Sequence, residues 1–418
     1  MNLRKITAVL LALLFVGMAV LPVTASPSPT EDITVVSKDP AVGQIGIDAS
    51  QMKIPKLQTD VKQKKVIVTG ELSPRADTGR DQILSQVAAA GETRGISSIP
   101  FGSIIYHDGK GTTTVYDSAG RQLFVTDDAN AAKITTPGSE SPATFVHEIP
   151  SGSIAKEYQG NTFIFHQGSL ILTIINTVEV NGSALSSIEQ TDAVTKAALT
   201  NYFGWIEYAE SNPVTADRFE STWTAPTRTP LNSGIRESLA IWNGIERSGV
   251  DGVMQPVLMW NFCPYGDSQL HLNYVGAAWD YHTISSPNKD SLHSTPIAVS
   301  PGNTVQGTMQ WSPSLSCWLI QFKNVATGST TAFYTSRFPR DNLKMYMAME
   351  ASAAGIKPTT NSLTGSVAFT NNIIRNGGST VPITFTGRIW PGASSVFSGL
   401  NPRVTTYPSL QVNLDTGR

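Results

Sequence analysis

The stretch that most constrains the fold runs from Trp242 to Trp260 and contains two apolar segments. A glycine-bearing turn, Ser248–Gly252, joins them and predicts two neighbouring strands. The second segment is almost unbroken in apolar character around Gln255, which is typical of a strand covered on both faces. A buried amide without partners costs roughly 1–3 kcal/mol, so Gln255 is either a satisfied core residue or a functional group.

The composition predicts a turn-rich β protein of two or three domains. The chain has 418 residues, of which 15% are charged and 40% are hydrophobic, and it contains 34 glycines and 25 prolines. The formal net charge of −2 gives no support for a nucleic acid or an anionic membrane as partner.

The N-terminus has the pattern of an export signal. Arg4 and Lys5 precede an apolar run over residues 6–21, and Val23–Ala25 offers small residues for cleavage. We therefore expect a signal peptide over residues 1–25 and a secreted or cell-surface protein. The alternative is an uncleaved signal anchor. No other segment of the sequence is apolar enough to cross a membrane.

Short apolar segments separated by turns recur along the rest of the chain, which predicts two packed antiparallel sheets. A hairpin is expected over residues 103–117, and one modest helix over residues 81–90. In chain order, the expected parts are a linker (26–60), a smaller β-rich domain that is a candidate propeptide (61–180), a connector (181–202), a β-sandwich (203–388) and a C-terminal tail (389–418).

The chain has two cysteines, Cys263 and Cys317. In an exported protein an even pair predicts a disulfide, and the alternative is two buried free thiols. Neither cysteine has the Cys/His setting of a catalytic nucleophile.

Other enzyme classes lack their signatures in this sequence. The six histidines do not have the spacing of a helical zinc motif, and there is neither a Gly-x-Ser-x-Gly elbow nor a phosphate-binding Gly-rich loop. We therefore expect no metal and no cofactor.

Several motifs of the second β domain occur in a characteristic order. They are Phe203–Trp205, Ser221–Pro226, Ile241–Ile245, Val253–Gln255, Ile297–Asn303, Trp318–Gly328, Ala348–Glu350 and Gly365–Thr370. In this order the region 203–370 resembles the glutamic peptidases of the eqolisin type. The resemblance implies an all-β, concanavalin-like antiparallel sandwich and a catalytic pair formed by Gln255 and Glu350.

The sequence also departs from the family pattern. The family's Glu-Trp is here Glu350–Ala351, and an equally simple register places Met345 before Tyr346 at that position and leaves no acid there. The aspartate expected near Trp-x-Gly-Ile is Glu246, and the Tyr-Glu-Trp-Tyr-Pro segment has only Ala278–Tyr281 as a loose counterpart.

A carboxylate and a carboxamide that face one water are sufficient for hydrolysis of a peptide bond. Glu350 would take a proton from the water and return it to the leaving amine, and Gln255 would donate to the oxyanion. A site built on carboxylates suits acidic conditions. The residues expected to contact the polypeptide substrate are Trp242, Trp260, Trp279, Glu246 and Asp280. The hypothesis requires Gln255 and Glu350 to share one sheet face and to open onto one groove.

Two other functions are compatible with the same features. Seven of the eight tryptophans lie between Trp205 and Trp318, and a non-catalytic extracellular sandwich would use such aromatic side chains to bind polysaccharide or peptide. A carbohydrate-cleaving enzyme would need two acids roughly 5–10 Å apart, and no clear second acid accompanies Glu350.

Overall fold

The computed structural model describes residues 56–60, 65–69, 82–85, 97–109, 111–131, 133–137, 139–158, 161–175, 202–230, 237–248, 252–262, 271–285, 288–353, 363–405 and 410–416. All of them belong to one compact unit, Ala41–Arg418. Over these residues the chain forms strands and two short 3-10 helices, with no α-helix. The expected signal peptide and most of the expected linker lie outside the described residues.

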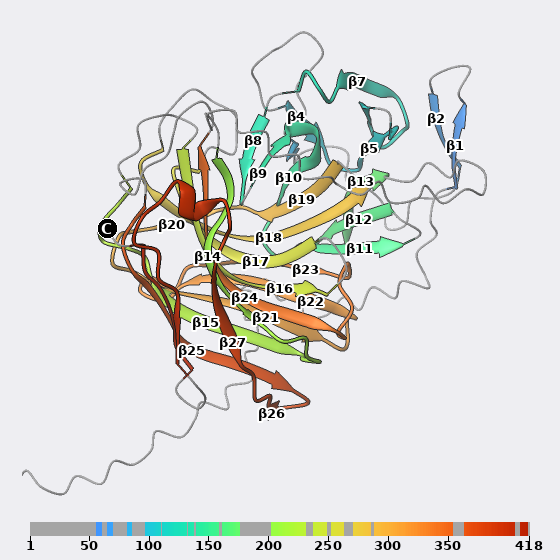
Figure 1. Ribbon diagram of the computed structural model, residues 1–418. Helices are drawn as coiled ribbons and strands as arrows, with labels where there is room; N and C mark the ends of the chain where they lie inside the picture. Colours follow the sequence, from blue (N-terminus) through green and yellow to red (C-terminus); the bar gives the residue numbers. More distant parts are fainter. Residues whose placement is uncertain are drawn as a thin grey trace, which may run out of the picture. The chain divides into compact units, whose positions relative to one another are not determined.

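The first large sheet, sheet 1, carries Gln255 and Glu350 (Figure 1). Its central strands are antiparallel. In spatial order its strands are β27 (Phe385–Ile389), β14 (Tyr202–Ser211), β24 (Leu343–Ala353), β16 (Glu237–Arg247), β17 (Gly252–Trp260), β18 (Tyr274–Ser285), β19 (Asn288–Ser294), β10 (Val146–Ile149), β3 (Gln82–Ser85) and β4 (Ser97–Pro100), with β20 (Ile297–Val299) beside β18.

The second large sheet, sheet 2, packs against sheet 1 and completes an all-β sandwich, as predicted. In spatial order its strands are β28 (Arg403–Val404), β29 (Val412–Leu414), β25 (Val367–Asn376), β15 (Arg218–Thr224), β21 (Thr304–Ser312), β22 (Cys317–Asn324), β23 (Thr330–Thr335), β11 (Ile154–Tyr158), β12 (Asn161–His166), β13 (Ser169–Ile175), β5 (Ser103–His107), β6 (Thr112–Tyr116) and β7 (Gln122–Asp127), with β26 (Ser379–Thr380) beside β25.

The remaining elements are small. The hairpins β1 (Lys56–Asp60)–β2 (Lys65–Thr69) and β8 (Lys133–Thr136)–β9 (Ser139–Pro142) form two-stranded sheets of their own. The 3-10 helix η2 (Ala143–Phe145) follows β9, and η4 (Ala393–Ser395) follows β27.

The core lies between the two sheets and is built from one side of each strand. Ile241 and Leu258 of sheet 1 belong to the same buried cluster as Ile320 and Phe322 of sheet 2. Both faces of β17 are buried except at Val253, which confirms the expectation of a doubly covered strand. We call the side of sheet 1 that faces sheet 2 its inner face, and the opposite side its outer face.

The two sheets approach most closely at Gly276. A Cβ atom at this position of β18 would lie 1.9 Å from Cε1 of Phe322 on β22. Phe322 is completely buried, so its ring cannot swing into solvent to make room. Only glycine therefore permits this contact between the sheets.

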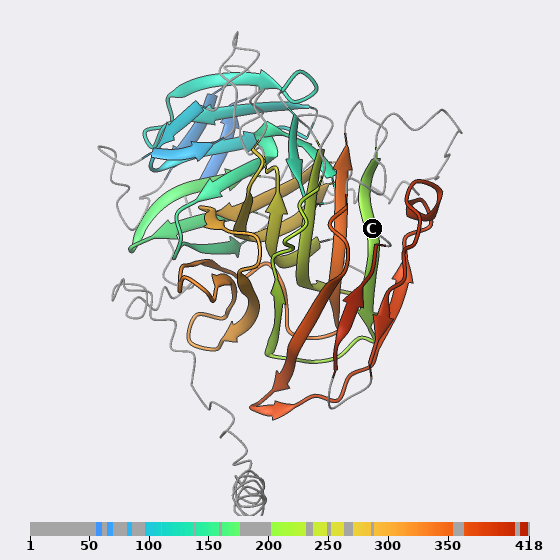
Figure 2. The same ribbon diagram turned by 90° about the vertical axis from the view of Figure 1, so that its left-hand side faces the viewer.

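Apart from the hairpins β1–β2 and β8–β9, the strands of the N-terminal half extend the two large sheets. β10 pairs with β19 of sheet 1 in parallel, from Val146/Ser291 to Ile149/Ser294. β11 pairs with β23 of sheet 2, also in parallel, at Ile154/Tyr334 and Ala155/Thr335. Figure 2 shows the blue and green strands of this half continuing into the yellow and orange strands.

Two local expectations are resolved by the pairing of strands. The hairpin over residues 103–117 is confirmed by β5 and β6. The helix expected over residues 81–90 is wrong in its first half, because Gln82–Ser85 is strand β3 and pairs with β4. Pairing with β4 and β10 outweighs the helical preference of this short segment. The C-terminal strand β29 lies within the expected tail, yet Val412 and Leu414 are buried in the core.

Replacing Gly276 by Ala should destabilise the protein by about 1–3 kcal/mol, because the added methyl group overpacks the contact with Phe322. Denaturant unfolding at constant pH measures this change. Gly392→Ala is the matched control, since Gly392 has an ordinary right-handed conformation and an added Cβ would come no closer than 3.7 Å to Trp390. Equal stability of the two variants would contradict the proposed role of Gly276.

Candidate functional site

The outer face of sheet 1 gathers most of the predicted site residues. Side chains alternate along each strand, so Ile241 and Leu258 enter the core whereas Trp242 and Val257 lie on the outer face. Trp242 and Trp279 belong to a second buried cluster, separate from the core. Gln255 is directly paired with Trp279, and so lies on this face as well.

One row of side chains crosses the outer face at the level of Gln255. Tyr346 of β24 lies opposite Gly244 of β16. Ile245 pairs with Met254, so Gln255 lies opposite Gly244 from the other side. Trp279 follows on β18 and His293 on β19. The β16–β17 ladder is interrupted at this level, next to Pro256, which has no amide hydrogen to donate.

Gln255 is a buried amide with an unused acceptor. Its side chain is only 1% exposed, and within the described part of the chain its Oε1 accepts no hydrogen bond. The indole Nε1 of Trp279, its direct neighbour, donates none to the described residues either. Such groups cost about 1–3 kcal/mol each when they stay unpaired. Two of them side by side on one face form a place where a polar ligand would be stabilised.

Glu350 lies on the same face but in a different row. It pairs with Ala240 on β16 and with Trp205 on β14, and only 3% of it is exposed. The Trp242 Nε1 donates a hydrogen bond of 2.9 Å to its Oε2. Burial raises the pKa of Glu350 to about 8, and the hydrogen bond from Trp242 opposes this rise. The carboxyl group is therefore protonated at neutral and acidic pH.

The structure does not bring Glu350 next to Gln255. Two strand spacings and four residues of strand rise separate them, which corresponds to roughly 16 Å between their Cα atoms. The Trp242 indole fills the space between. Its Nε1 contacts Glu350, and its Cζ3 lies 2.6 Å from where a Cβ of Gly244 would be. The two residues share a face, as the sequence hypothesis requires, but neither is open to a groove.

Glu246 is the acid that lies beside Gln255. It is directly paired with Val253 on β17 and with Lys344 on β24, so Gln255 and Tyr346 are its diagonal neighbours on the two sides. The Tyr346 hydroxyl is hydrogen-bonded to the Glu246 carboxylate. Unlike Glu350, Glu246 is partly exposed. The sequence suggested it only as a substrate contact.

The alternative register of the glutamate strand is also resolved. Met345 is completely buried and belongs to the core between the sheets, so it lies on the inner face of β24. A residue at this position cannot reach Gln255. Tyr346, the next residue, is the one that lies level with Gln255 on the outer face.

Two of the predicted substrate contacts lie on the opposite face. Trp260 packs edge-to-face on Tyr274 in the core, with ring centroids 4.8 Å apart. Asp280 is completely buried and accepts a 2.6 Å hydrogen bond from Thr335 of sheet 2. On its own strand, each of the two residues is an odd number of positions away from a residue of the outer face. Because side chains alternate between the two faces, its side chain points to the inner face. Both side chains therefore lie on the inner face, away from Gln255.

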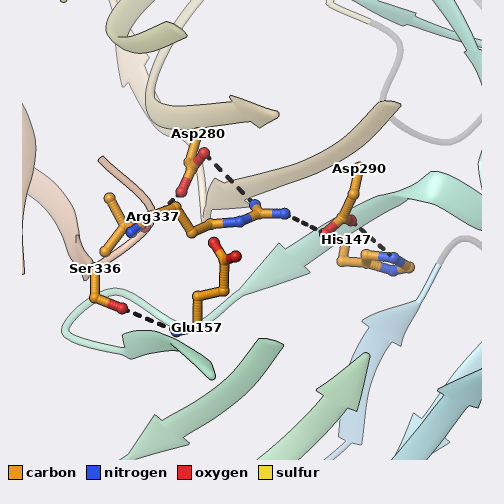
Figure 3. Close-up of polar contacts among 7 residues, drawn as sticks. His147, Glu157, Asp280, Asp290, Ser336 and Arg337 are labelled. Carbon is orange, nitrogen blue, oxygen red and sulfur yellow. Dashed lines mark hydrogen bonds and ion pairs between the residues drawn. The ribbon is translucent and has the colours of Figure 1, made fainter. Parts of the chain in front are cut away.

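Asp280 belongs instead to a buried ionic network with Arg337 and Asp290, and His147 of the N-terminal strand β10 lies beside it (Figure 3). Arg337 Nη1 lies 3.5 Å from Asp280, and its Nη2 donates a 2.5 Å hydrogen bond to Asp290. His147 of β10 completes the chain, with its Nε2 at 3.5 Å from Asp290. Burial, with a smaller effect of the Arg337 charge, lowers the pKa of His147 to about 3, so it is neutral here. A buried pair of this kind is costly to break, since it leaves an uncompensated charge.

Part of the N-terminal half covers the outer face. Ile134 of β8, Ala143 of η2 and Val146 of β10 belong to the same buried cluster as Trp242 and Trp279. In addition, η2 contacts β19 and β9 contacts β14. We call residues 133–146 the cover segment. It accounts for part of the burial on this face.

Cys317 is a buried free thiol that packs with Ile154 and Leu315. Burial raises its pKa, against the effect of the neighbouring Lys156. Its predicted partner, Cys263, lies outside the described residues, and the predicted disulfide is not found at Cys317.

Across the part of the chain that the structure describes, no three His, Cys, Asp or Glu side chains are grouped so that they could hold a metal ion. No helix among these residues is long and apolar enough to span a membrane.

Comparison with known proteins finds likeness only among solved structures. No protein-family model matches, and neither does any curated protein sequence. A Scytalido-glutamic peptidase bound to a peptide-based transition-state analogue matches with 15% identity and a TM-score of 0.35, over 51% of this chain and 98% of that one. SCP-B, of the eqolisin family, matches with 15% identity and a TM-score of 0.33, over 51% of this chain and 98% of that one. A Bacteroides ovatus GH16 mixed-linkage glucan protein matches with 11% identity and a TM-score of 0.23, over 35% of this chain and 67% of that one. At these values the matches assign neither activity nor residues.

Replacing Glu350 by Gln should stabilise the protein at pH 8 and have little effect at pH 5. The pKa of about 8 lies above the ordinary value of 4.5, so the stabilisation by the bound proton is complete below pH 4.5 and is lost as the pH rises through 8. Glutamine still accepts from Trp242 but never ionises. We expect a gain of up to about 4 kcal/mol at pH 8 in denaturant unfolding.

Glu210→Gln serves as the control, because the Glu210 carboxylate is ion-paired with Arg388 near the surface. This variant should gain nothing at pH 8. A Glu350→Gln variant with the same stability change at both pH values would show that the Glu350 carboxyl is not held protonated.

Proposed function

We propose that this protein is a peptidase whose active surface is the outer face of sheet 1, with Gln255 as the oxyanion donor. The observation that supports a peptide-binding site here is the pairing on one face of an unpaired acceptor, Gln255 Oε1, with an unpaired donor, Trp279 Nε1, on a face that also carries glutamates. A buried carboxamide with unused hydrogen-bonding capacity matches a peptide group, which offers both a carbonyl oxygen and an N–H.

The chemistry requires a carboxylate, a carboxamide and water. The carboxylate takes a proton from water while the water oxygen bonds to the peptide carbonyl carbon, and the carbonyl electrons move onto oxygen. The Gln255 N–H donates to that oxyanion. When the C–N bond breaks, the carboxyl group returns the proton to the leaving amine. We further propose that the protein is secreted and acts at acidic pH.

The buried state of the site supports a latent form of the enzyme. Gln255 is 1% exposed, and the cover segment packs into the same apolar cluster as its neighbours. A polypeptide substrate reaches Gln255 only after this segment moves. We therefore propose that the N-terminal half acts as a propeptide that keeps the site closed until it is displaced.

A second candidate function has one specific observation in its favour. Trp390, at the end of β27, is 45% exposed, and its ring centroid lies 6.2 Å from that of Trp205 on the outer face. An exposed aromatic ring next to another is a surface on which sugar rings or apolar side chains stack. A non-catalytic protein that binds polysaccharide or peptide would use this pair.

The test is cleavage of a denatured protein substrate between pH 2 and pH 7, with and without a chelator. Both the intact full-length chain and a chain cut at a protease site inserted between Ile175 and Tyr202 should be assayed. We expect chelator-resistant cleavage at acidic pH, stronger after the cut. Gln255→Ala should lower kcat about 100-fold, the usual effect of losing one oxyanion donor.

Gln306→Ala is the control, because Gln306 is also a strand glutamine but is only partly buried and lies on sheet 2, bonded to Glu220. It should leave cleavage unchanged. No cleavage by either form of the wild-type chain, combined with retention on a polysaccharide column that Trp390→Ala abolishes, would favour the binding protein instead.

A further inference from the structure

Glu246 is placed where a carboxylate could act together with Gln255. Gly244 has no side chain, so the Trp242 indole packs over it, and Gln255, Tyr346 and Glu246 surround this position on the outer face. Diagonal neighbours on adjacent strands have Cα atoms about 7–8 Å apart, which is within reach for a glutamate and a glutamine that share one water molecule. Glu350, by contrast, is roughly 16 Å from Gln255.

Tyr346 holds the Glu246 carboxylate from the side opposite Gln255. Burial, the charge of Glu246 and the hydrogen bond to it together raise the pKa of Tyr346, so its hydroxyl remains protonated and donates. A buried tyrosine with T-shaped packing on Trp205, at 5.0 Å between centroids, has little freedom to rotate. This arrangement resembles the pairing of a catalytic base with a group that orients it.

Glu246 is more accessible to solvent than Glu350. Glu350 is 3% exposed, and the Trp242 indole donates a hydrogen bond to its carboxyl group. Glu246 is partly exposed near the end of β16 and is paired in register with Lys344, whose Nζ lies 3.8 Å from Glu210 Oε2. The other titratable groups near it on this face are Tyr346 of β24, Glu210 and Tyr208 of β14, and Tyr281 of β18.

We propose that Glu246, and not Glu350, is the catalytic acid–base residue of this site, and that Tyr346 positions its carboxylate. This inference rests on the proposed peptidase function. Glu246 takes the proton from the attacking water, the new C–O bond sends the carbonyl electrons to an oxygen bonded by Gln255, and the proton then passes from Glu246 to the departing amine nitrogen. The role of Glu350 is structural: with Trp242, it fixes the indole that lies over Gly244.

The decisive experiment compares two isosteric variants, Glu246→Gln and Glu350→Gln, in the full-length chain, both intact and cut between Ile175 and Tyr202. The readout is kcat/KM for peptide cleavage from pH 2 to pH 7. Glu246→Gln should lose at least 100-fold, the typical contribution of general acid–base catalysis. Glu350→Gln should stay within a few-fold of the wild type.

Tyr346→Phe tests the positioning role by a readout that a purely structural effect would not move. Loss of a donor to the Glu246 carboxylate should shift the acidic limb of the pH–rate profile to higher pH. Glu246→Asp retains the charge but withdraws it by one methylene, and should lose about ten-fold. This second variant keeps the test valid if Glu246→Gln folds poorly.

Full activity of Glu246→Gln, or a 100-fold loss confined to Glu350→Gln, would overturn the assignment of Glu246 while leaving the proposed peptidase intact. An unshifted pH profile in Tyr346→Phe would remove the positioning role. Absence of cleavage by the wild type in both forms would remove the proposed function, and this inference with it.

Discussion

The side chains of β16, β17 and β24 have to serve two buried faces at once, and this constraint determines what the molecule can do. Because successive residues point to opposite sides, Ile241, Leu258 and Met347 fill the space between the sheets only if their neighbours Trp242, Val257 and Ala348 lie on the outer face. A register shift of one residue in any of these strands would move its core side chains to the outer face and its outer-face side chains into the core. The close contact of Gly276 with Phe322 holds the sheets at the distance that this packing needs.

The same alternation explains why the outer face is closed. A sheet with an apolar outer face needs a second layer over it, and the N-terminal half supplies that layer through Ile134, Ala143 and Val146. It is attached by edge-strand pairing on both sheets. Burial on this scale raises the pKa of Glu350 to about 8, as expected for a carboxyl group that has little contact with water. The described state is therefore a stable, covered sandwich.

Sequence patterns predicted the elements of this fold well and the site only in part. The strand around Gln255, its burial on both faces and the hairpin over residues 103–117 followed from local periodicity and turn residues. The helix expected at residues 81–90 failed because pairing with β4 and β10 decides a segment whose own preference is weak. Gln255 and Glu350 were rightly expected on one face, but their separation depends on the register of β24 against β16, which no residue pattern specifies. Glu246 could have been recognised as an outer-face acid, since it is four residues from Trp242 on a strand.

By itself the sequence determined that the chain is all-β and that an amide lies within an apolar strand. It also determined that few acids are near this amide, and that the tryptophans are large apolar side chains available for burial. These properties are local, because alternation and side-chain type act within one strand. Only the tertiary structure decided which acid meets the amide, which tryptophans turn inward, and that Asp280 neutralises Arg337 instead of facing a ligand. Those outcomes depend on strand register and on contacts between residues far apart in the chain. Their energies arise only when the sheets pack together.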